Sequence, residues 1–407
     1  MKYQILTGDN RDTLKTIADN SIDAIVTDPP YGIDFLGKAW DANTGALETY
    51  QECLRVLKPG GHILAFSAAR TYHHLATTLE QAGFEIRDQI MWIYSSGFPK
   101  SQDVGKSIER SEGKRKKTRR VLDIRPEYSQ GVKGYCIDCN KSLNGKNDKK
   151  CQREDCGFKE HNKPAQNEWA GWGTQLKPAH EPICMARKPI KLGSIQKNVQ
   201  QWGTGALNID ATRIPSEPRM VLTPKKGTYQ CVSNEHSKNI TTAENSEWKE
   251  YGDRFPSNVI GEITEPYQKY FYCPKVSRKE RHIGCIDPGP MFERPRDENG
   301  KPVGEGESMW MDPKVSGPKK IAEQPAGTNN HPTVKPVELM KYLIKLVTPP
   351  NGIVLDPFNG SGSTGMAAVE LGHEYIGCEL DPNYVEIAKR RIEAWNKTDT
   401  NFQELFE

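Results

Sequence analysis

The stretch Ile22-Asp23-Ala24-Ile25-Val26-Thr27-Asp28-Pro29-Pro30-Tyr31 decides the fold and also indicates a site. Its apolar part, Ile22 to Val26, stops abruptly at Asp28, which predicts a buried strand that opens into a rigid loop. The two prolines fix φ and remove two backbone donors, so the carbonyls of Asp28 and Pro29 can stay free as acceptors. Tyr31 adds a flat ring beside them. A carboxylate, two stiff carbonyls and an aromatic face suit an exocyclic amino group on a planar base, although the same peptide can also be a simple turn at the end of a strand.

Around this stretch, the first hundred residues alternate between strand and helix periods. The pattern predicts strands at Tyr3 to Leu6, Ala24 to Thr27, His62 to Phe66 and Ile86 to Tyr94, and helices at Asp12 to Ile17, Leu47 to Leu57 and Thr71 to Ala82. Strands and helices that alternate at this spacing are typical of βαβ units with a parallel sheet covered on both faces.

The same alternation returns after residue 330. The pattern predicts helices at Pro336 to Leu346, Ser363 to Leu371 and Tyr384 to Trp395, and strands at Ile353 to Leu355 and Tyr375 to Cys378. Two strands are too few for a stable open sheet. We therefore expect both ends of the chain to form one doubly wound α/β domain, with residues 1–100 as one half, residues 331–396 as the other and 397–407 as a polar tail.

The intervening residues 101–330 are rich in Gly, Pro, Lys, Asn and Ser and show no lasting period. A structureless loop of this length inside one domain is improbable, so an inserted domain is expected here. The whole chain of 407 residues has 35% apolar residues, 35 Gly and 28 Pro, which agrees with a packed core plus an irregular segment.

Charge and apolar runs limit the classes of function. The formal net charge is only +3, so any nucleic-acid surface must come from local clusters of basic residues. The N-terminus lacks the apolar stretch of a signal peptide, and no run reaches membrane-spanning length. We expect a soluble cytoplasmic protein, in a bacterium or a phage-infected host cell, with no membrane partner. Ten Cys in a reducing compartment argue against a disulfide framework.

A second constellation, Asp356-Pro357-Phe358-Asn359-Gly360-Ser361-Gly362-Ser363-Thr364-Gly365, lies between a predicted strand and a predicted helix. Gly360 and Gly362 let the backbone approach a ligand closely, and the helix N-terminus offers free amide donors. The next predicted strand ends in Glu379, at a position where an acidic side chain can bind the hydroxyls of a ribose. Nucleotide-binding dehydrogenases use similar geometry, and a turn loosened by glycine is the alternative.

Together these residues resemble the amino-methylating DNA methyltransferases that use S-adenosylmethionine (SAM). In that family the Asp-Pro-Pro-Tyr peptide is the catalytic motif, here Asp28, Pro29, Pro30 and Tyr31, and Phe-x-Gly-x-Gly is the cofactor motif. The catalytic motif comes first here, which is similar to the β class, a circular permutation of the usual fold. The resemblance implies a mixed sheet of the Rossmann-like SAM-dependent methyltransferase type, with the first half catalytic, the last half binding SAM and the insertion recognising the target.

The resemblance also implies which residues bind the cofactor. Gly8-Asp9 looks like the acidic motif that contacts the adenine of SAM, and the segment His331 to Pro336 looks like the one that contacts its methionine end. The residues expected to bind SAM are Asp9, Lys335, Asp356, Phe358, Gly360, Gly362 and Glu379.

The same resemblance predicts methylation of adenine N6 in double-stranded DNA. In this family an Asp at the first motif position accompanies adenine N6 and a Ser accompanies cytosine N4, so Asp28 favours adenine. Asp28 and the Pro29 carbonyl would accept the amino hydrogens while Tyr31 stacks on the base, which must be flipped out of the duplex. Cytosine-N4 methylation is the main alternative. Methylation of RNA or of a protein amide, and a non-catalytic DNA-binding relic, are lesser ones.

Four cysteines in the middle region have the spacing of a metal site. Cys136 and Cys139 form a C-x2-C pair, and Cys151 and Cys156 form a C-x4-C pair. This spacing fits a tetrahedral structural Zn²⁺ site, which would supply folding energy to a zinc module at about residues 133–162. His161 in place of one Cys and four ordinary reduced thiols are the alternatives.

A basic run precedes the cysteines. Phosphate contacts are its simplest role, and a solvated loop is its alternative. Its members are Lys114, Arg115, Lys116, Lys117, Arg119 and Arg120. The sequence leaves open the recognised site, a homodimer and a partner endonuclease.

Overall fold

The computed structural model describes residues 3–33, 43–94, 101–114, 134–136, 141–143, 164–176, 178–224, 246–261, 276–285, 328–331 and 333–397. The chain divides into two compact units. The first comprises Met1–Ser95, Ala179–Asp287 and Gly327–Glu407, and the second comprises Ser96–Pro178 and Pro288–Ala326.

Within the described residues, eight strands of the first unit form one mixed sheet in the order β1-β12-β11-β2-β3-β7-β4-β10. The strands β1, β12, β11, β2 and β3 are parallel, β7 is antiparallel to β3 and β4, and β10 is parallel to β4. Their bounds are β1 Tyr3–Thr7, β2 Ile22–Thr27, β3 Leu57–Phe66, β4 Glu85–Ile93, β7 His180–Arg187, β10 Val259–Gly261, β11 Ile353–Asp356 and β12 Glu374–Glu379.

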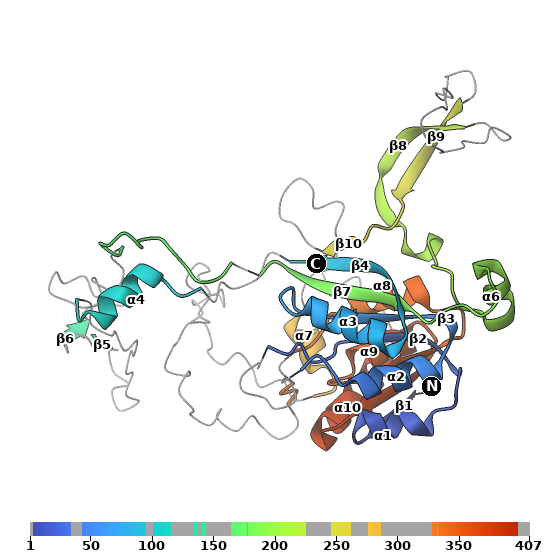
Figure 1. The fold of residues 1–407 in the computed structure, drawn as a ribbon, viewed down its shortest axis with the longest axis horizontal. Coiled ribbons are helices and arrows are strands. Elements are labelled where there is room, and N and C mark those ends of the chain that lie inside the picture. The colour runs from blue at the N-terminus through green and yellow to red at the C-terminus, as the bar shows by residue number, and fades with distance from the viewer. Residues whose placement is uncertain are drawn as a thin grey trace, which may run out of the picture. The chain divides into compact units, whose positions relative to one another are not determined.

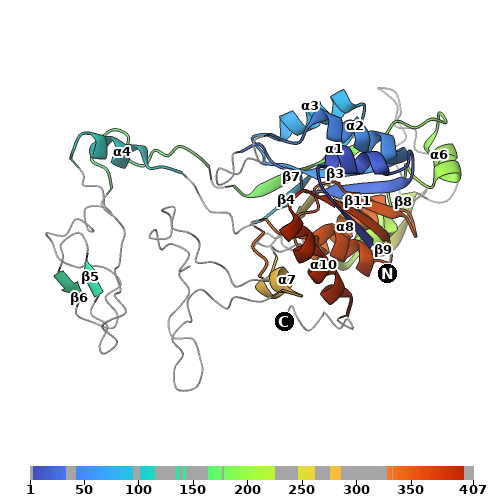
Figure 2. The same cartoon turned by 90° about the horizontal axis from the view of Figure 1, so that it is seen from below.

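Helices cover both faces of this sheet. Figure 2 shows α1, α2 and α3 on one side and α8 and α10 on the other, with the sheet between them. The helical segments of this unit are α1 Asn10–Thr13, η1 Leu14–Thr16, α2 Leu47–Val56, α3 Tyr72–Ala82, α6 Ile195–Trp202, η4 Asp210–Thr212, α7 Arg278–His282, α8 Val337–Val347, α9 Ser363–Glu370 and α10 Pro382–Lys397.

The alternation of side chains along the strands explains the two layers. In β2 every residue is buried, because both faces of this strand are covered. Ala24 and Val26 pack into a core with residues of α8, α9 and α10, whereas Ile25 packs into a second core with residues of α2 and α3. The expected doubly wound α/β arrangement, built from both ends of the chain, is thus present as a mixed sheet.

The strand order places a topological switch point between β11 and β2. From β11 the chain passes through α9 to β12 on one side, and from β2 it passes through α2 to β3 on the other. Open α/β sheets bind ligands beyond the carboxyl ends of the strands at such a point, here the ends of β2 and β11. The two peptides singled out from the sequence begin at these ends.

The middle of the chain differs from the expectation in one respect. Strands β7 and β10 lie within residues 101–330, the range expected as an insertion, yet both pair with strands of the large sheet. In β7 the residues Pro182 to Arg187 are all buried. Pairing with strands about a hundred residues away stabilises this segment, and local periodicity does not reveal such pairing.

The first unit also carries an antiparallel two-stranded ribbon, β8 Ile214–Pro224 and β9 Ser246–Arg254, drawn at the upper right in Figure 1. The described part of the second unit contains α4 Val104–Ser111 and the antiparallel pair β5 Gly134–Cys136 and β6 Lys141–Leu143. Helix α4 begins at Asp103, whose carboxylate caps the helix by accepting from the amide of Lys106.

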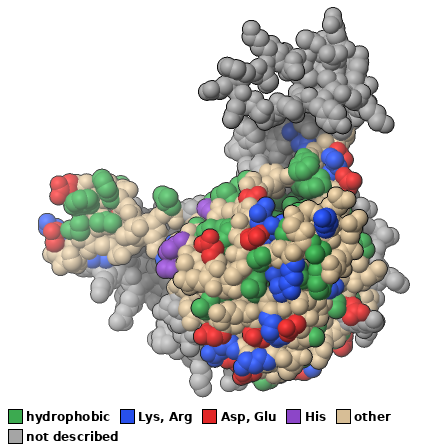
Figure 3. Space-filling model, turned by 45° about the vertical axis from the view of Figure 1, so that its right-hand side comes forward, with side chains coloured by type: hydrophobic (Ala, Val, Ile, Leu, Met, Phe, Trp, Pro, Cys, Tyr) green, Lys and Arg blue, Asp and Glu red, His purple; other side chains and the backbone are tan. Residues whose placement is uncertain are grey.

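Charges of both signs are mixed on the face drawn in Figure 3, where Lys and Arg side chains alternate with Asp and Glu among the described residues. This face shows no broad basic area, in keeping with the small net charge of +3. None of the described helices combines the length and the apolar character that crossing a membrane requires.

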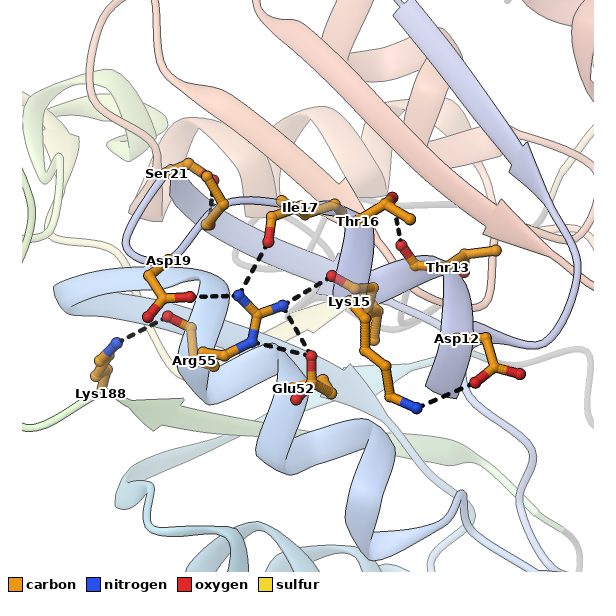
Figure 4. Close-up of polar contacts among 12 residues, drawn as sticks. Asp12, Thr13, Lys15, Thr16, Ile17, Asp19, Ser21, Glu52, Arg55 and Lys188 are labelled. Carbon is orange, nitrogen blue, oxygen red and sulfur yellow. Dashed lines mark hydrogen bonds and ion pairs between the residues drawn. The ribbon is translucent and has the colours of Figure 1, made fainter.

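Arg55 on α2 fastens the segment between β1 and β2 to the sheet unit (Figure 4). Its guanidinium donates to the carbonyls of Leu14 and Ile17, each at 2.9 Å. It also forms ion pairs with Asp19 and with Glu52, the latter at 2.8 Å. Leu14 follows α1 and begins η1, and Ile17 follows η1. The Arg55 side chain therefore binds both ends of η1, in the connection between β1 and β2.

We expect Arg55→Ala to lower the free energy of unfolding by about 1–3 kcal/mol, because the variant leaves partly buried carbonyls without their donor. Urea denaturation measures this. The control is Lys15→Ala, whose ion pair with Asp12 lies on the surface and should contribute less than about 0.5 kcal/mol. Equal losses in the two variants would contradict the role given to Arg55.

Candidate active site

The carboxylate of Asp356 joins the carboxyl ends of β2 and β11. Asp356 Oδ1 accepts from Thr27 Oγ1 at 2.6 Å, and its Oδ2 accepts from Thr364 Oγ1 at 2.6 Å. The amide of Phe358 also donates to Oδ1, at 3.0 Å. Burial raises the pKa of Asp356 to about 6, and the three donors oppose that rise. Asp356, expected to bind the cofactor, thus directs its carboxylate to the protein's own turn.

The Gly-rich turn is tightly packed. Gly362 has φ +80°, and a Cβ there would lie 2.9 Å from Cβ of Ala388. Gly360 has φ +52°, and a Cβ there would lie 2.8 Å from Nε2 of His331. Helix α9 begins immediately after Gly362, so its first amides face the same edge of the sheet as the turn. Only glycine combines this backbone conformation with so little space.

Glu379 closes the turn from the neighbouring strand β12. Its Oε2 accepts from the amide of Gly360 at 2.7 Å, and its Oε1 accepts from the amide of Asp381 at 3.0 Å. Burial raises the pKa of Glu379 to about 7. A carboxylate has about four acceptor positions, so two bound amides leave room for further donors such as ligand hydroxyls.

The end of β1 lies beside the end of β12. The amide of Gly8 donates to the carbonyl of Glu379 at 2.9 Å, and Thr7 is in register with Glu379. Asp9 then caps α1 by accepting from the amide of Arg11, and it forms an ion pair with the same residue at 2.6 Å. The structure therefore brings Asp9, Glu379 and the Gly-rich turn to one edge of the sheet, as the sequence led us to expect.

Arg391 supports the Gly-rich turn, and the sequence did not indicate this residue. This fully buried side chain on α10 donates to the carbonyl and the hydroxyl of Ser361, at 2.6 and 3.0 Å. It also donates to the carbonyl of Glu280 in α7, at 3.2 Å. Burial lowers the pKa of Arg391 to about 10. Arg391 thus links the Gly-rich turn to α7. In the sequence, no local signal distinguishes it from other basic residues of an amphipathic helix.

The Asp28-to-Tyr31 peptide takes part in a second cluster, beyond the end of β2. Lys335 Nζ donates to Asp28 Oδ2 at 2.6 Å, and the hydroxyl of Tyr31 lies 2.9 Å from Asp28 Oδ1. The same hydroxyl lies 2.9 Å from Oε2 of Glu181, which comes from β7. Lys335 also lies 3.1 Å from the Tyr31 hydroxyl and 3.4 Å from Glu181 Oε2. The four side chains thus contact one another although 307 residues separate Asp28 from Lys335.

Burial and charge set the protonation of this cluster. Burial raises the pKa of Asp28, and Lys335 opposes the rise. Burial disfavours the charge of Lys335, but Asp28 and Glu181 outweigh it and raise the pKa of this ammonium. Burial, Asp28 and Glu181 together raise the pKa of Tyr31 well above its ordinary value. At neutral pH the cluster therefore holds a protonated lysine and a neutral phenol.

Lys335 was expected at the cofactor's methionine end, and here its ammonium contacts the carboxylate of Asp28. It also lies 4.9 Å from the centre of the Phe66 ring, within the range of a cation–π contact. Glu181 was not among the expected site residues. One glutamate among short apolar pieces carries no signal of its own in the sequence.

The structure brings the remaining expected residues together only in part. Pro29 is buried beside Asp28, and Phe358 packs against Tyr50 with ring centres 6.4 Å apart.

Of the four expected zinc ligands, Cys139, Cys151 and Cys156 lie outside the described residues, and Cys136 is described by its backbone alone. No group of three or more His, Cys, Asp or Glu side chains within the described ranges is arranged to hold a metal ion.

The basic run also lies mostly outside the described residues. Lys114 is exposed and forms an ion pair with Glu112 at 2.9 Å. The other expected DNA-contacting residues, Arg115, Lys116, Lys117, Arg119 and Arg120, are not described.

Comparison with known proteins gives a family match over most of the chain. The model of a DNA methylase family, N6_N4_Mtase, matches residues 22–390. Two curated relatives are type II methyltransferases: M2.DpnII of Streptococcus pneumoniae is 42% identical over 80 residues, and M.HinfI of Haemophilus influenzae is 38% identical over 85. These matches cover 20% and 21% of this chain, and they span 29% and 23% of the relatives.

Among solved structures, the M1.HpyAVI–SAM complex is 17% identical with a TM-score of 0.39, over 96% of this chain and 98% of that one. The assignment of this chain to a family therefore rests on the DNA methylase model that matches residues 22–390.

The raised pKa of Glu379 predicts a pH-dependent stability. Its pKa rises from 4.5 to about 7 on folding, so between these values the folded chain binds more protons than the unfolded one. The stabilisation from protonated Glu379 is complete below about pH 4.5 and is lost as the pH rises through about 7. Glu379→Gln has no carboxyl group at this position to titrate, so it does not lose this stabilisation. The free energy of unfolding of the variant minus that of wild type should therefore be about 1–3 kcal/mol larger at pH 7.5 than at pH 4.5.

Chemical denaturation at the two pH values measures this difference, and comparing them cancels any hydrogen bond that the glutamine fails to replace. Glu386→Gln, which removes an exposed carboxylate from α10, is the control. A difference between Glu379→Gln and wild type that stays constant with pH would be evidence against a buried, partly protonated Glu379.

Proposed function

We propose that this chain, which belongs to the N6/N4 DNA methylase family, transfers a methyl group from SAM to N6 of adenine in double-stranded DNA. One observation carries the proposal. The Asp28-to-Tyr31 peptide and the Gly-rich turn lie at the ends of neighbouring strands, joined by the hydrogen bond between Thr27 and Asp356. A ligand on the turn and a base at the peptide would therefore share one crevice.

The residues at the cofactor edge suit SAM. The tight turn at Gly360 and Gly362 lets a ligand approach the backbone, and Glu379 keeps acceptor positions for the two hydroxyls of a ribose. Asp9, Phe358, Asp356 and Lys335 complete the proposed SAM-binding set. When bound, SAM supplies the methyl group on a positively charged sulfur, which makes that group strongly electrophilic.

The chain's own residues would position and polarise the amino group of the base. That nitrogen is a poor nucleophile because its lone pair is delocalised into the ring. Asp28 and the Pro29 carbonyl would accept its two hydrogens, which favours a pyramidal nitrogen whose lone pair points at the methyl group. Pro29 and Pro30 keep this acceptor pair rigid, and the Tyr31 ring provides a face for the base. Positioning and electrostatics suffice, so Asp28 need not remove a proton before the transfer.

The choice of adenine rests on Asp28 at the first position of the motif. The matched family covers both N6 and N4 methylation, so cytosine N4 is the alternative. A match described as DNA methylase argues against RNA or protein amides as substrates. The acceptors and the turn are intact, which argues against a relic that only binds DNA.

The proposal extends to the order of the two motifs in the chain, the position of the target base and the region between the two halves. The catalytic peptide precedes the Gly-rich turn in the chain, which supports the permuted β-class order. The target base would be flipped out, since the end of a strand cannot reach a base inside a duplex. A recognition role is proposed for the region between the two halves, with the basic run Lys114 to Arg120 on phosphates.

We also propose a structural zinc site in the second unit. Cys136 is the last residue of β5, which pairs with β6, and Cys139 follows it in the sequence with C-x2-C spacing. Two-cysteine knuckles of this kind bind zinc when a second pair completes the tetrahedron, here Cys151 and Cys156. The purified chain should contain about one zinc ion. Cys151→Ser should lose it, while Cys53→Ser in the core of the first unit should retain it.

Asp28→Asn should reduce methyl transfer from labelled SAM to DNA by about 10²–10³-fold, because it removes a charged acceptor aimed at the reacting nitrogen. SAM binding, measured by calorimetry, should change little, since the variant leaves the Gly-rich turn intact. Asp12→Asn, which removes an exposed carboxylate from α1, is the control and should keep full activity. Full activity of Asp28→Asn would overturn the proposed mechanism.

A further inference from the structure

Glu181 is a second carboxylate at the catalytic peptide, and it comes from a strand outside both motifs. It lies near the start of β7, in register with Trp92 of β4. Its side chain is 19% exposed, as is that of Asp28. Such limited exposure means that each carboxylate depends on protein donors for part of its solvation.

The two carboxylates compete for the same donors. The Tyr31 hydroxyl has one proton and lies 2.9 Å from both Asp28 Oδ1 and Glu181 Oε2, so it can donate to only one of them at a time. Lys335 is shared in the same way, at 2.6 Å from Asp28 and 3.4 Å from Glu181. Without Glu181, neither donor would be divided between two carboxylates.

This competition matters for the chemistry of the amino group. An Asp28 carboxylate that accepts from both Tyr31 and Lys335 has much of its charge neutralised, which weakens it as an acceptor although Oδ1 keeps one lone-pair position. When Tyr31 donates to Glu181 instead, Asp28 Oδ1 regains its second position and becomes a stronger acceptor for a hydrogen of the base. The second carboxylate also leaves the cluster with one more negative than positive charge, which favours the positively charged sulfur of SAM and the transition state.

We propose that Glu181 is a positioning residue that draws the Tyr31 hydroxyl away from Asp28 and thereby makes Oδ1 a stronger acceptor for a hydrogen of the target amino group. It also balances the charge of Lys335. This inference rests on the proposed methyltransferase function and adds a residue from β7 to the site.

The first test is the pH profile of kcat for Glu181→Gln. The glutamine keeps the size of the side chain but loses its charge, so kcat should fall about 10- to 100-fold, with the KM for SAM within about twofold of wild type. The titratable groups near Asp28 are Lys335, Tyr31, Glu181 and Asp356, and Tyr94 interacts with Glu181. Because Glu181 raises the pKa of Asp28, its loss should move the acid limb of the profile to lower pH.

The matched control is Glu85→Gln. Glu85 forms an ion pair with Arg187 at 2.6 Å, at the opposite end of the same antiparallel strand pair. Its variant should keep the kcat and the pH profile of wild type. A lower kcat in Glu181→Gln with an unmoved acid limb would indicate a merely structural role and overturn the inference.

A second test separates the Tyr31 contact from activity. With 3-fluorotyrosine at position 31, a fluorine NMR titration reports the pKa of this hydroxyl directly. The pKa should fall in Glu181→Gln, since the negative charge and the acceptor that stabilise the neutral phenol are lost. In a Tyr31→Phe background, Glu181→Gln should reduce kcat by a smaller factor than in wild type.

The outcomes distinguish the two proposals. If wild type methylates DNA while Glu181→Gln is unchanged in kcat, pH profile and tyrosine pKa, the inference fails and the proposed function stands. If wild type methylates no DNA, the proposed function fails and the inference fails with it. A reduced kcat, a shifted acid limb and a lowered tyrosine pKa together support both.

Discussion

The hydrogen bonds of the Asp356 carboxylate are the constraint on which the site depends. Through Thr27 this carboxylate holds the end of the catalytic strand, and through Thr364 and the amide of Phe358 it holds the Gly-rich turn. Strands β2 and β11 are far apart in the chain but adjacent in the sheet. A buried carboxylate satisfied by three donors at this junction fixes the distance between the proposed methyl donor and the proposed acceptor base.

Buried charges surround this junction on both sides, and each depends on partners from distant segments. Arg391 fastens the turn to α7, Glu379 binds the turn from β12, and Lys335 lies between Asp28 and Glu181. Such groups are costly to bury unless they are paired, so each is sensitive to the loss of a single partner. The same arrangement keeps the acceptors of the site in place before any ligand binds, as electrostatic catalysis requires.

The sequence predicted those parts of the fold that local patterns determine. The helices α2, α3, α8, α9 and α10 begin and end within a few residues of the expected positions, because their apolar spacing and the glycines and prolines at their ends act locally. Strand β7 was not expected, since its burial arises from pairing with β3 and β4 across the sheet. Glu181 and Arg391 were missed for the same reason: their partners are 150 and 30 residues away. Lys335 was expected at the cofactor, yet its nearest partner is Asp28.

The most direct test of the central claim is methylome sequencing of DNA from cells that express the protein. It reports both the modified base and its sequence context in one measurement. The account predicts N6-methyladenine at a defined short site, absent from cells that express Asp28→Asn. N4-methylcytosine at such a site would keep the fold and the cofactor but contradict the assignment of adenine to Asp28. Unmodified DNA in cells that contain the folded protein would contradict the proposed function itself.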